Sequence, residues 1–193
     1  MPYRPDHKAA TRQKIVESAR RMFNRRGFSE VTLEEIMADA GLSHGGFYRH
    51  FASKEELYAA AVKYFICKKT PESWQSGVGK TRARRVIDAY FSLDHFVDGE
   101  CCCPLISLPS DVSRSGDTVK AAYREVVEML VKIFEAELTE PQARERALAA
   151  AALCVGGMVL ARGVDDPALA SDLRDAARRH ALVAIGSGEA EAG

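Results

Sequence analysis

The sequence predicts an all-α protein with a small N-terminal head and a larger helical body. Apolar residues recur at helical spacing along most of the chain, and helix-capping residues precede several of these stretches. No stretch alternates in the manner of a β-strand. A length of 193 residues suits one compact unit or two subdomains that share a core. We expect a head at residues 1–52 and a regulatory, ligand-binding and dimerisation body at residues 53–193.

The first helix is expected at residues 9–26, because its apolar residues recur every three to four positions and Gly27 follows at the place of a C-cap. Thr32 and Glu35 have the spacing of a capping box. This box predicts a second helix that ends at residues 40–41.

A tight turn at Gly41–Ser43 is expected next, with Ser43 as the cap of a short helix at residues 44–51. Ser53 and Glu56 form a second capping box, which predicts a helix that reaches about residue 69.

The body is expected to consist of further helices. Prolines and an acidic residue mark several of their starts, because proline suits the first turn of a helix. The expected segments are residues 83–97, a helix from Pro104 that Pro109 kinks or ends, residues 117–138, an apolar helix from Pro141 to residue 160, and a last helix from Asp166-Pro167 to about residue 185.

The charge is unevenly distributed although the net charge is zero. Residues 1–70 carry 13 Lys and Arg against 8 Asp and Glu, and the rest of the chain carries 14 against 19. A basic head on an acidic body favours nucleic-acid binding by the head.

The composition favours a cytoplasmic protein. No apolar run reaches the roughly 18 residues that span a bilayer, and the polar start lacks the core of a signal peptide. Five cysteines, an odd number, do not form a closed disulfide framework. We expect no membrane partner.

Residues 34–51 have the layout of a helix-turn-helix, in which two short helices are joined by a turn of three or four residues. Gly41 allows the sharp turn. Gly45 and Gly46 lie in the second helix, where each costs about 1 kcal/mol relative to alanine. Folding alone does not explain this cost, whereas close approach of the backbone to a DNA major groove does.

The second helix is therefore the expected recognition helix. The tips of Tyr48, Arg49 and His50 suit base or phosphate contacts, and Lys54 lies at a helix N-terminus that favours phosphate. The expected DNA-binding residues are Thr32, Ser43, His44, Gly45, Gly46, Phe47, Tyr48, Arg49, His50 and Lys54.

These residues resemble the head of the TetR (tetracycline-repressor) family over residues 11–60. The segments that carry the resemblance are Phe28–Ile36, Ala40–Ser43, Phe47–Phe51 and Ser53–Leu57.

The resemblance implies a homodimeric transcription factor, usually a repressor. In such a protein the last two helices of each chain pack into a four-helix bundle, and a small molecule in the body releases a palindromic double-stranded operator. Gly156-Gly157 in the penultimate helix suits close packing, either between two chains or within one.

Aromatic, sulfur-containing and polar residues of the body fall on helices that line the effector pocket in the resembling family. The expected lining residues are Tyr64, Trp74, Tyr90, Phe91, His95, Cys103, Tyr123, Met158 and Arg162.

A thiol-based sensor of oxidants or electrophiles is the alternative function. Cys101, Cys102 and Cys103 precede an expected helix, and a helix N-terminus lowers the pKa of a thiol. The run also fits small buried filler residues, or a metal site that recruits Cys67, His95 or Cys154.

Two other classes of protein were weighed. An enzyme lacks support, because the sequence has no nucleophile elbow, no evident carboxylate pair and no metal-ligand cluster. A DNA-architectural protein without a ligand would need a fully packed body. We expect neither catalysis nor a cofactor.

Overall fold

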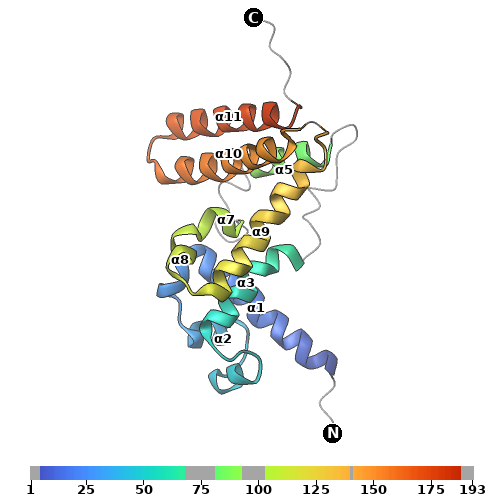
Figure 1. The fold of residues 1–193 in the computed structure, drawn as a ribbon. Helices are drawn as coiled ribbons and strands as arrows, with labels where there is room; N and C mark the ends of the chain where they lie inside the picture. Colours follow the sequence, from blue (N-terminus) through green and yellow to red (C-terminus); the bar gives the residue numbers. More distant parts are fainter. Residues whose placement is uncertain (1–4, 68–80, 93–102, 140, 188–193) are drawn as a thin grey trace, which may run out of the picture. The chain divides into compact units, whose positions relative to one another are not determined.

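The structure is a computed structural model that describes residues 5–67, 81–92, 103–139 and 141–187. Its described residues form helices and turns, which confirms the predicted all-α class (Figure 1). The elements are α1 (Pro5–Glu30), α2 (Leu33–Asp39), the 3-10 helix η1 (His44–Arg49), α3 (Lys54–Cys67), α5 (Arg82–Tyr90), α7 (Pro104–Ser107), α8 (Pro109–Arg114), α9 (Asp117–Glu135), α10 (Ala143–Gly163) and α11 (Pro167–Ala184).

The chain divides into two compact units. The first combines residues 1–67 with residues 99–126, and the second combines residues 68–98 with residues 127–193. The division falls inside α9. The expected functional boundary at residue 52 lies within the first unit and stays a prediction.

The core of the first unit is an aromatic cluster between α1 and α3. The side chains of Phe23 and Tyr58 are fully buried, and their ring centres are 5.0 Å apart. Phe28 stacks on Tyr58 with a centre-to-centre distance of 4.7 Å. Buried aromatic pairs of this geometry stabilise beyond the area that they bury. Residues on either side of Gly27 are thereby held against α3.

The second unit contains α10 and α11, which lie side by side, together with α5 (Figure 1). Arg178 of α11 forms an ion pair with Asp88 of α5 over 2.5 Å. A Cβ atom at Gly157 would overlap the Cβ of Ala177 on α11, whereas one at Gly156 would meet nothing within 4 Å. Gly157 therefore serves close packing within the chain.

Several predicted starts are confirmed. Pro104 stands in the first turn of α7 as predicted. Pro109 was expected to kink or end that helix, and α7 does end before it, at Ser107, while Pro109 begins a separate helix, α8. Asp166 caps α11, because its carboxylate accepts hydrogen bonds from the N–H groups of Ala168 and Leu169 over 2.9 and 3.3 Å.

Other predicted boundaries were wrong. The first helix begins at Pro5 rather than residue 9, and Gly27, with φ of 81°, interrupts it before Glu30. The helix predicted to reach residue 97 ends at Tyr90, where Ser92 turns back to bond the carbonyl of Ala89.

Two boundaries of the long helices also differ. The helix predicted to end at residue 138 ends at Glu135. The apolar helix begins at Ala143, because Pro141 lies in the preceding turn instead of the first helical turn.

The expectation that no segment is long and apolar enough to span a bilayer was wrong for α10. An 18-residue window of this helix has a mean hydropathy of 1.4, and 39% of the window is buried inside the structure. Length and composition alone are weak grounds for a membrane span, since core helices meet the same criterion.

Candidate nucleic-acid interface

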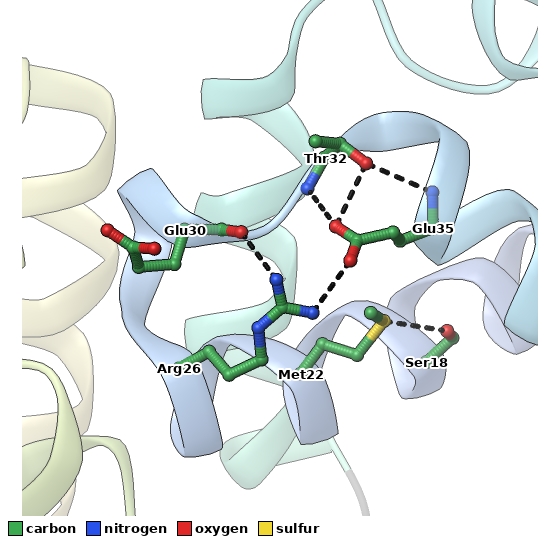
Figure 2. Close-up of polar contacts among 6 residues, drawn as sticks. All are labelled: Ser18, Met22, Arg26, Glu30, Thr32 and Glu35. Carbon is green, nitrogen blue, oxygen red and sulfur yellow. Dashed lines mark hydrogen bonds and ion pairs between the residues drawn. The ribbon is translucent and has the colours of Figure 1, made fainter.

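The capping box that begins α2 is present as predicted. The backbone N–H of Glu35 donates to the hydroxyl of Thr32 over 3.2 Å, and the Glu35 carboxylate accepts from the N–H of Thr32 over 2.8 Å (Figure 2). Arg26 of α1 reaches the same carboxylate over 2.8 Å. The bond from the Thr32 backbone and then the Arg26 contact lower the pKa of Glu35 to about 2.

A second set of polar contacts holds α2 against α1. The buried hydroxyl of Ser18 donates to the carboxylate of Asp39 over 2.5 Å and also lies 3.2 Å from the carbonyl oxygen of Ile36, so its single proton is shared between the two acceptors. Arg21 donates to the same Asp39 oxygen over 2.7 Å. These bonds fix the end of α2, and with it the direction in which the chain leaves the helix.

The turn after α2 has the predicted geometry. Gly41 has φ of 72°, a left-handed conformation that glycine adopts without the strain of a Cβ atom. The N–H of Leu42 donates to the carbonyl of Met37 over 2.8 Å. The next element therefore starts at a sharp angle, as a helix-turn-helix requires.

The element that follows is a 3-10 helix, not the predicted α-helix at residues 44–51. The N–H of Gly46 donates to the carbonyl of Ser43 over 3.0 Å, which is a bond across three residues. Ser43 occupies the N-cap position, but its side chain makes no capping bond, so that part of the prediction was wrong. Two glycines in six residues account for the tighter, shorter helix.

Two buried aromatic side chains hold η1 against the interior of the first unit. Phe47 and Phe51 are buried, and their rings stack with centres 5.8 Å apart. Tyr48 in contrast is 65% exposed. The element thus buries one face and presents the other to solvent.

Most of the predicted DNA-binding residues lie on solvent-facing positions of this region. Gly46, His50 and Lys54 are half-buried, and Phe47 is buried. Those that are exposed are Thr32, Ser43, His44, Gly45, Tyr48 and Arg49.

A family profile described as "Bacterial regulatory proteins, tetR family" matches residues 15–61, which contain α2, the turn and η1. This part of the chain is a TetR-family head.

Relatives of this chain are named as transcriptional regulators. It is 27% identical over 133 residues to the HTH-type transcriptional repressor DhaR of Mycobacterium sp. (strain GP1), covering 68% of this chain and 67% of DhaR. It is 24% identical over 163 residues to the regulator LmrA of Bacillus subtilis, covering 78% and 85%. It is 40% identical to the uncharacterized regulator YerO of Bacillus subtilis over 55 residues, which span 28% of this chain and 19% of YerO.

Solved structures share the fold. Reduced Escherichia coli NemR has a TM-score of 0.73 at 20% identity and covers 89% of this chain and 95% of its own. A TetR-family regulator from Cytophaga hutchinsonii has a TM-score of 0.72 at 21% identity and covers 98% and 100%.

The side chain of Lys54 contacts the protein itself, which differs from the phosphate contact predicted for it. Its ammonium donates to the carbonyl of Phe28 over 2.6 Å and lies 4.3 Å from the centre of the Phe28 ring. Burial lowers the pKa of Lys54. In this conformation the charge stabilises the end of α1, so a phosphate contact by Lys54 stays a prediction.

His50 lies where several cations converge. Burial lowers its pKa most, and the charges of Lys8, Arg12 and Arg49 lower it further. Lys8 and Arg12 were missed by the sequence reasoning. Their spacing of four residues places both on one face of the first helix, which is the signal that was available.

The predicted effector-pocket residues of the body divide between the two units. Cys103, Tyr64 and Tyr123 belong to the first unit. Burial, and then Cys103, raise the pKa of Tyr123 to about 12, so these two side chains lie close together. Tyr90, Phe91, Met158 and Arg162 belong to the second unit, and Trp74 and His95 lie outside the described residues.

Of the cysteine run, Cys103 lies within the part of the chain that the structure describes, and Cys101 and Cys102 do not. Cys103 is fully buried at the N-cap of α7. Across residues 5–67, 81–92, 103–139 and 141–187, no group of three or more His, Cys, Asp or Glu side chains is arranged to hold a metal ion.

Proposed function

We propose that this protein is a dimeric transcriptional repressor that binds a palindromic operator through η1 and is released by a small molecule in its body. One observation carries the DNA-binding part: η1 is anchored by buried Phe47 and Phe51 and projects an exposed Tyr48. A solvated tyrosine on a well-anchored short helix has little role in folding, but it suits contact with a base edge or a phosphate.

The polar residues around Tyr48 support the same proposal. His44 and Arg49 are exposed at the two ends of η1. Gly45 is exposed as well, with nothing within 4 Å of the place where its Cβ would be. The start of η1 therefore has no side chain at this position, which allows its backbone to come close to a groove edge.

Dimerisation is supported by apolar side chains that α10 and α11 leave exposed. Leu160 and Val183 are each 58% exposed, and the other large ones on these helices are Leu148, Val159 and Leu169. Clustered exposed apolar residues on two neighbouring helices suit a two-fold interface between copies of the chain. An apolar interface on α10 would also account for the high mean hydropathy of this helix.

A small-molecule effector is supported by polar groups inside the first unit. Tyr123 lies near Cys103, and its hydroxyl donates to the carbonyl of Leu105 over a long 3.4 Å. Such a weakly held phenol is available to a ligand that makes a shorter bond. A ligand releases DNA to the extent that it prefers the DNA-free state.

Thiol sensing is the second candidate function. The cysteine run and the similarity to NemR, which was solved in a reduced form, favour it. Complete burial of Cys103 counts against direct reaction with an oxidant, because a reactive thiolate needs access to solvent.

The function is tested by fluorescence anisotropy with duplexes from the DNA that flanks the protein's own gene. Saturable, sequence-selective binding that weakens steeply with salt is expected. His44→Ala is expected to alter sequence preference, whereas Lys54→Ala tests whether that charge contacts phosphate. Equal, weak binding to every duplex would contradict operator recognition.

The same titration separates the two kinds of signal. Release of the duplex after oxidation with hydrogen peroxide, reversed by dithiothreitol, would favour thiol sensing. A Cys103→Ser variant that still responds would assign the response to other cysteines. If oxidation has no effect on operator binding, the small-molecule effector is the remaining signal.

A further inference from the structure

A basic cluster lies at the end of η1, and two of its three residues were not among the predicted DNA contacts. It consists of Lys8 and Arg12 from α1 and Arg49 from η1, and all three side chains are exposed. We propose that this basic cluster binds a backbone phosphate of the DNA, so that the first helix forms part of the interface. The inference rests on the proposed function and adds contacts from Lys8 and Arg12 of α1 to those expected from the recognition helix.

The guanidinium of Arg12 stacks on an aromatic ring of the short segment between η1 and α3. Its guanidinium carbon lies 4.4 Å from the centre of the Phe51 ring. Phe51 is itself buried and stacked on Phe47. A guanidinium over an aromatic face keeps its N–H groups directed outward, which suits a phosphate oxygen. Arg12 is thus held at the C-terminal end of η1.

Lys8 extends the same row by one helical turn. Residues four apart on an α-helix share a face, and both Lys8 and Arg12 belong to α1. Burial lowers the pKa of His50, and the charges of Lys8, Arg12 and Arg49 lower it further, as expected of three cations near one side chain. A phosphate at that point would relieve their mutual repulsion.

The cations of the cluster are poorly neutralised by the protein. In the described part of the chain, neither Lys8 nor Arg49 makes an ion pair, and Arg12 reaches Glu56 over 3.8 Å with both side chains almost half exposed. Arg21 and Arg26, further along α1, instead pair with carboxylates over 2.7 and 2.8 Å. The cations in the first half of α1 are therefore available to an external anion. Arg21 and Arg26 in the second half instead pair with carboxylates of α2.

A DNA phosphate is the anion that the position favours. The cluster adjoins the exposed end of η1, so an anion there would belong to the same ligand that η1 contacts. Lysine and arginine at phosphates fix the register of a protein on a duplex without reading its sequence. The basic cluster and η1 would then divide positioning and reading between them.

The test measures the salt dependence of duplex binding for Lys8→Ala and Arg12→Gln. The probes are a fluorescein-labelled duplex from the DNA flanking the gene and a random-sequence duplex of equal length. Each lost charge is expected to reduce the slope of log K against log salt by about 0.9 on both duplexes, because a phosphate contact carries no sequence information. Arg12→Lys is expected to retain most of the slope.

Lys14→Ala is the matched control. Lys14 is also exposed on α1 but lies on another face of the helix, so its slope is expected to equal that of the wild type. Circular dichroism and thermal unfolding verify that each variant is folded. If folded Lys8→Ala and Arg12→Gln proteins have the same slope as Lys14→Ala, the inference is overturned.

The two proposals fail in different ways. A wild-type protein that binds neither duplex would overturn the proposed function together with this inference. Wild-type binding whose sequence preference responds to His44→Ala, with an unchanged slope in the cluster variants, would overturn the phosphate contact alone.

Discussion

The carboxylate of Asp111 accepts a hydrogen bond from the backbone N–H of Phe28 over 2.8 Å, although the residues are 83 positions apart. The same carboxylate oxygen lies 2.8 Å from where a Cβ atom at Gly27 would be. Asp111 belongs to α8, and Gly27 is where α1 breaks before the chain enters α2. The orientation of the helix-turn-helix is therefore tied to α8 within the first unit.

Replacing Asp111 with alanine is expected to destabilise the protein by about 1–3 kcal/mol, because the N–H of Phe28 loses its acceptor in a part-buried position. Urea unfolding followed by circular dichroism measures the change. Asp111→Asn keeps an acceptor oxygen and is expected to lose less. Equal stability of Asp111→Ala and wild type would mean that water replaces the carboxylate without loss.

Gly27→Ala is expected to destabilise the protein by at least about 1 kcal/mol. The backbone φ of 81° is unfavourable for any residue with a Cβ, and the added methyl would press on the Asp111 carboxylate. Thermal unfolding measures the loss. Combining Gly27→Ala with Asp111→Ala removes the contact but retains the strain, so the second change is expected to cost less in the variant than in the wild type.

Gly45→Ala is expected to separate folding from DNA binding. No atom lies within 4 Å of the added methyl, and alanine favours helical backbone over glycine, so stability is expected to stay equal or to rise by up to about 1 kcal/mol. The methyl would project from the proposed DNA-facing surface, and anisotropy is expected to show weaker operator binding. Unchanged binding would place the groove contact elsewhere on η1.

The capping carboxylate of Glu35 is expected to make stability sensitive to acid. Its pKa is about 2 in the folded protein and near 4.5 in the unfolded chain. Its contribution is therefore fully present above about pH 4.5 and is lost as the pH falls towards 2. Urea unfolding at a series of pH values is expected to show a shallower acid loss in Glu35→Gln than in wild type. Parallel curves would contradict this role.

Charges placed on the exposed apolar face of α10 and α11 are expected to dissociate the proposed dimer. Burial of a leucine side chain stabilises by about 1.5–3 kcal/mol, and a two-fold interface contains each position twice. Leu160→Glu and Val183→Glu are therefore each expected to raise the dimer dissociation constant more than about tenfold in sedimentation equilibrium. Lys120→Glu, on an exposed position of α9, serves as the control.

Local signals in the sequence predicted the head well. Half of the second capping box is present: the N–H of Glu56 donates to the hydroxyl of Ser53 over 3.1 Å, but the Glu56 carboxylate accepts from the N–H of Ala52 instead of that of Ser53. Such bonds join residues three or four apart, so the sequence contains both partners side by side. The start of α7 at Pro104 was predictable for the same reason, and so was its end before Pro109.

Contacts between distant residues were not predictable in this way. Nothing near Lys54 in the sequence indicates that its ammonium binds the carbonyl of Phe28, 26 residues earlier. The stacking of Arg12 over Phe51 likewise depends on how α1 packs against the head. Sequence reasoning therefore located the short helix after the turn, but it assigned Lys54 by its place at a helix start and did not consider Lys8 and Arg12 of α1.

The division of η1 into a buried side and an exposed side bears on how such a protein diversifies. Phe47 and Phe51 hold the element in place, whereas His44, Tyr48 and Arg49 contribute little to the packed interior. Substitutions at the outer positions are expected to leave folding intact, since surface changes usually alter stability by less than about 0.5 kcal/mol. A duplicated gene can therefore acquire a new target sequence through a few outer residues while inheriting the scaffold unchanged.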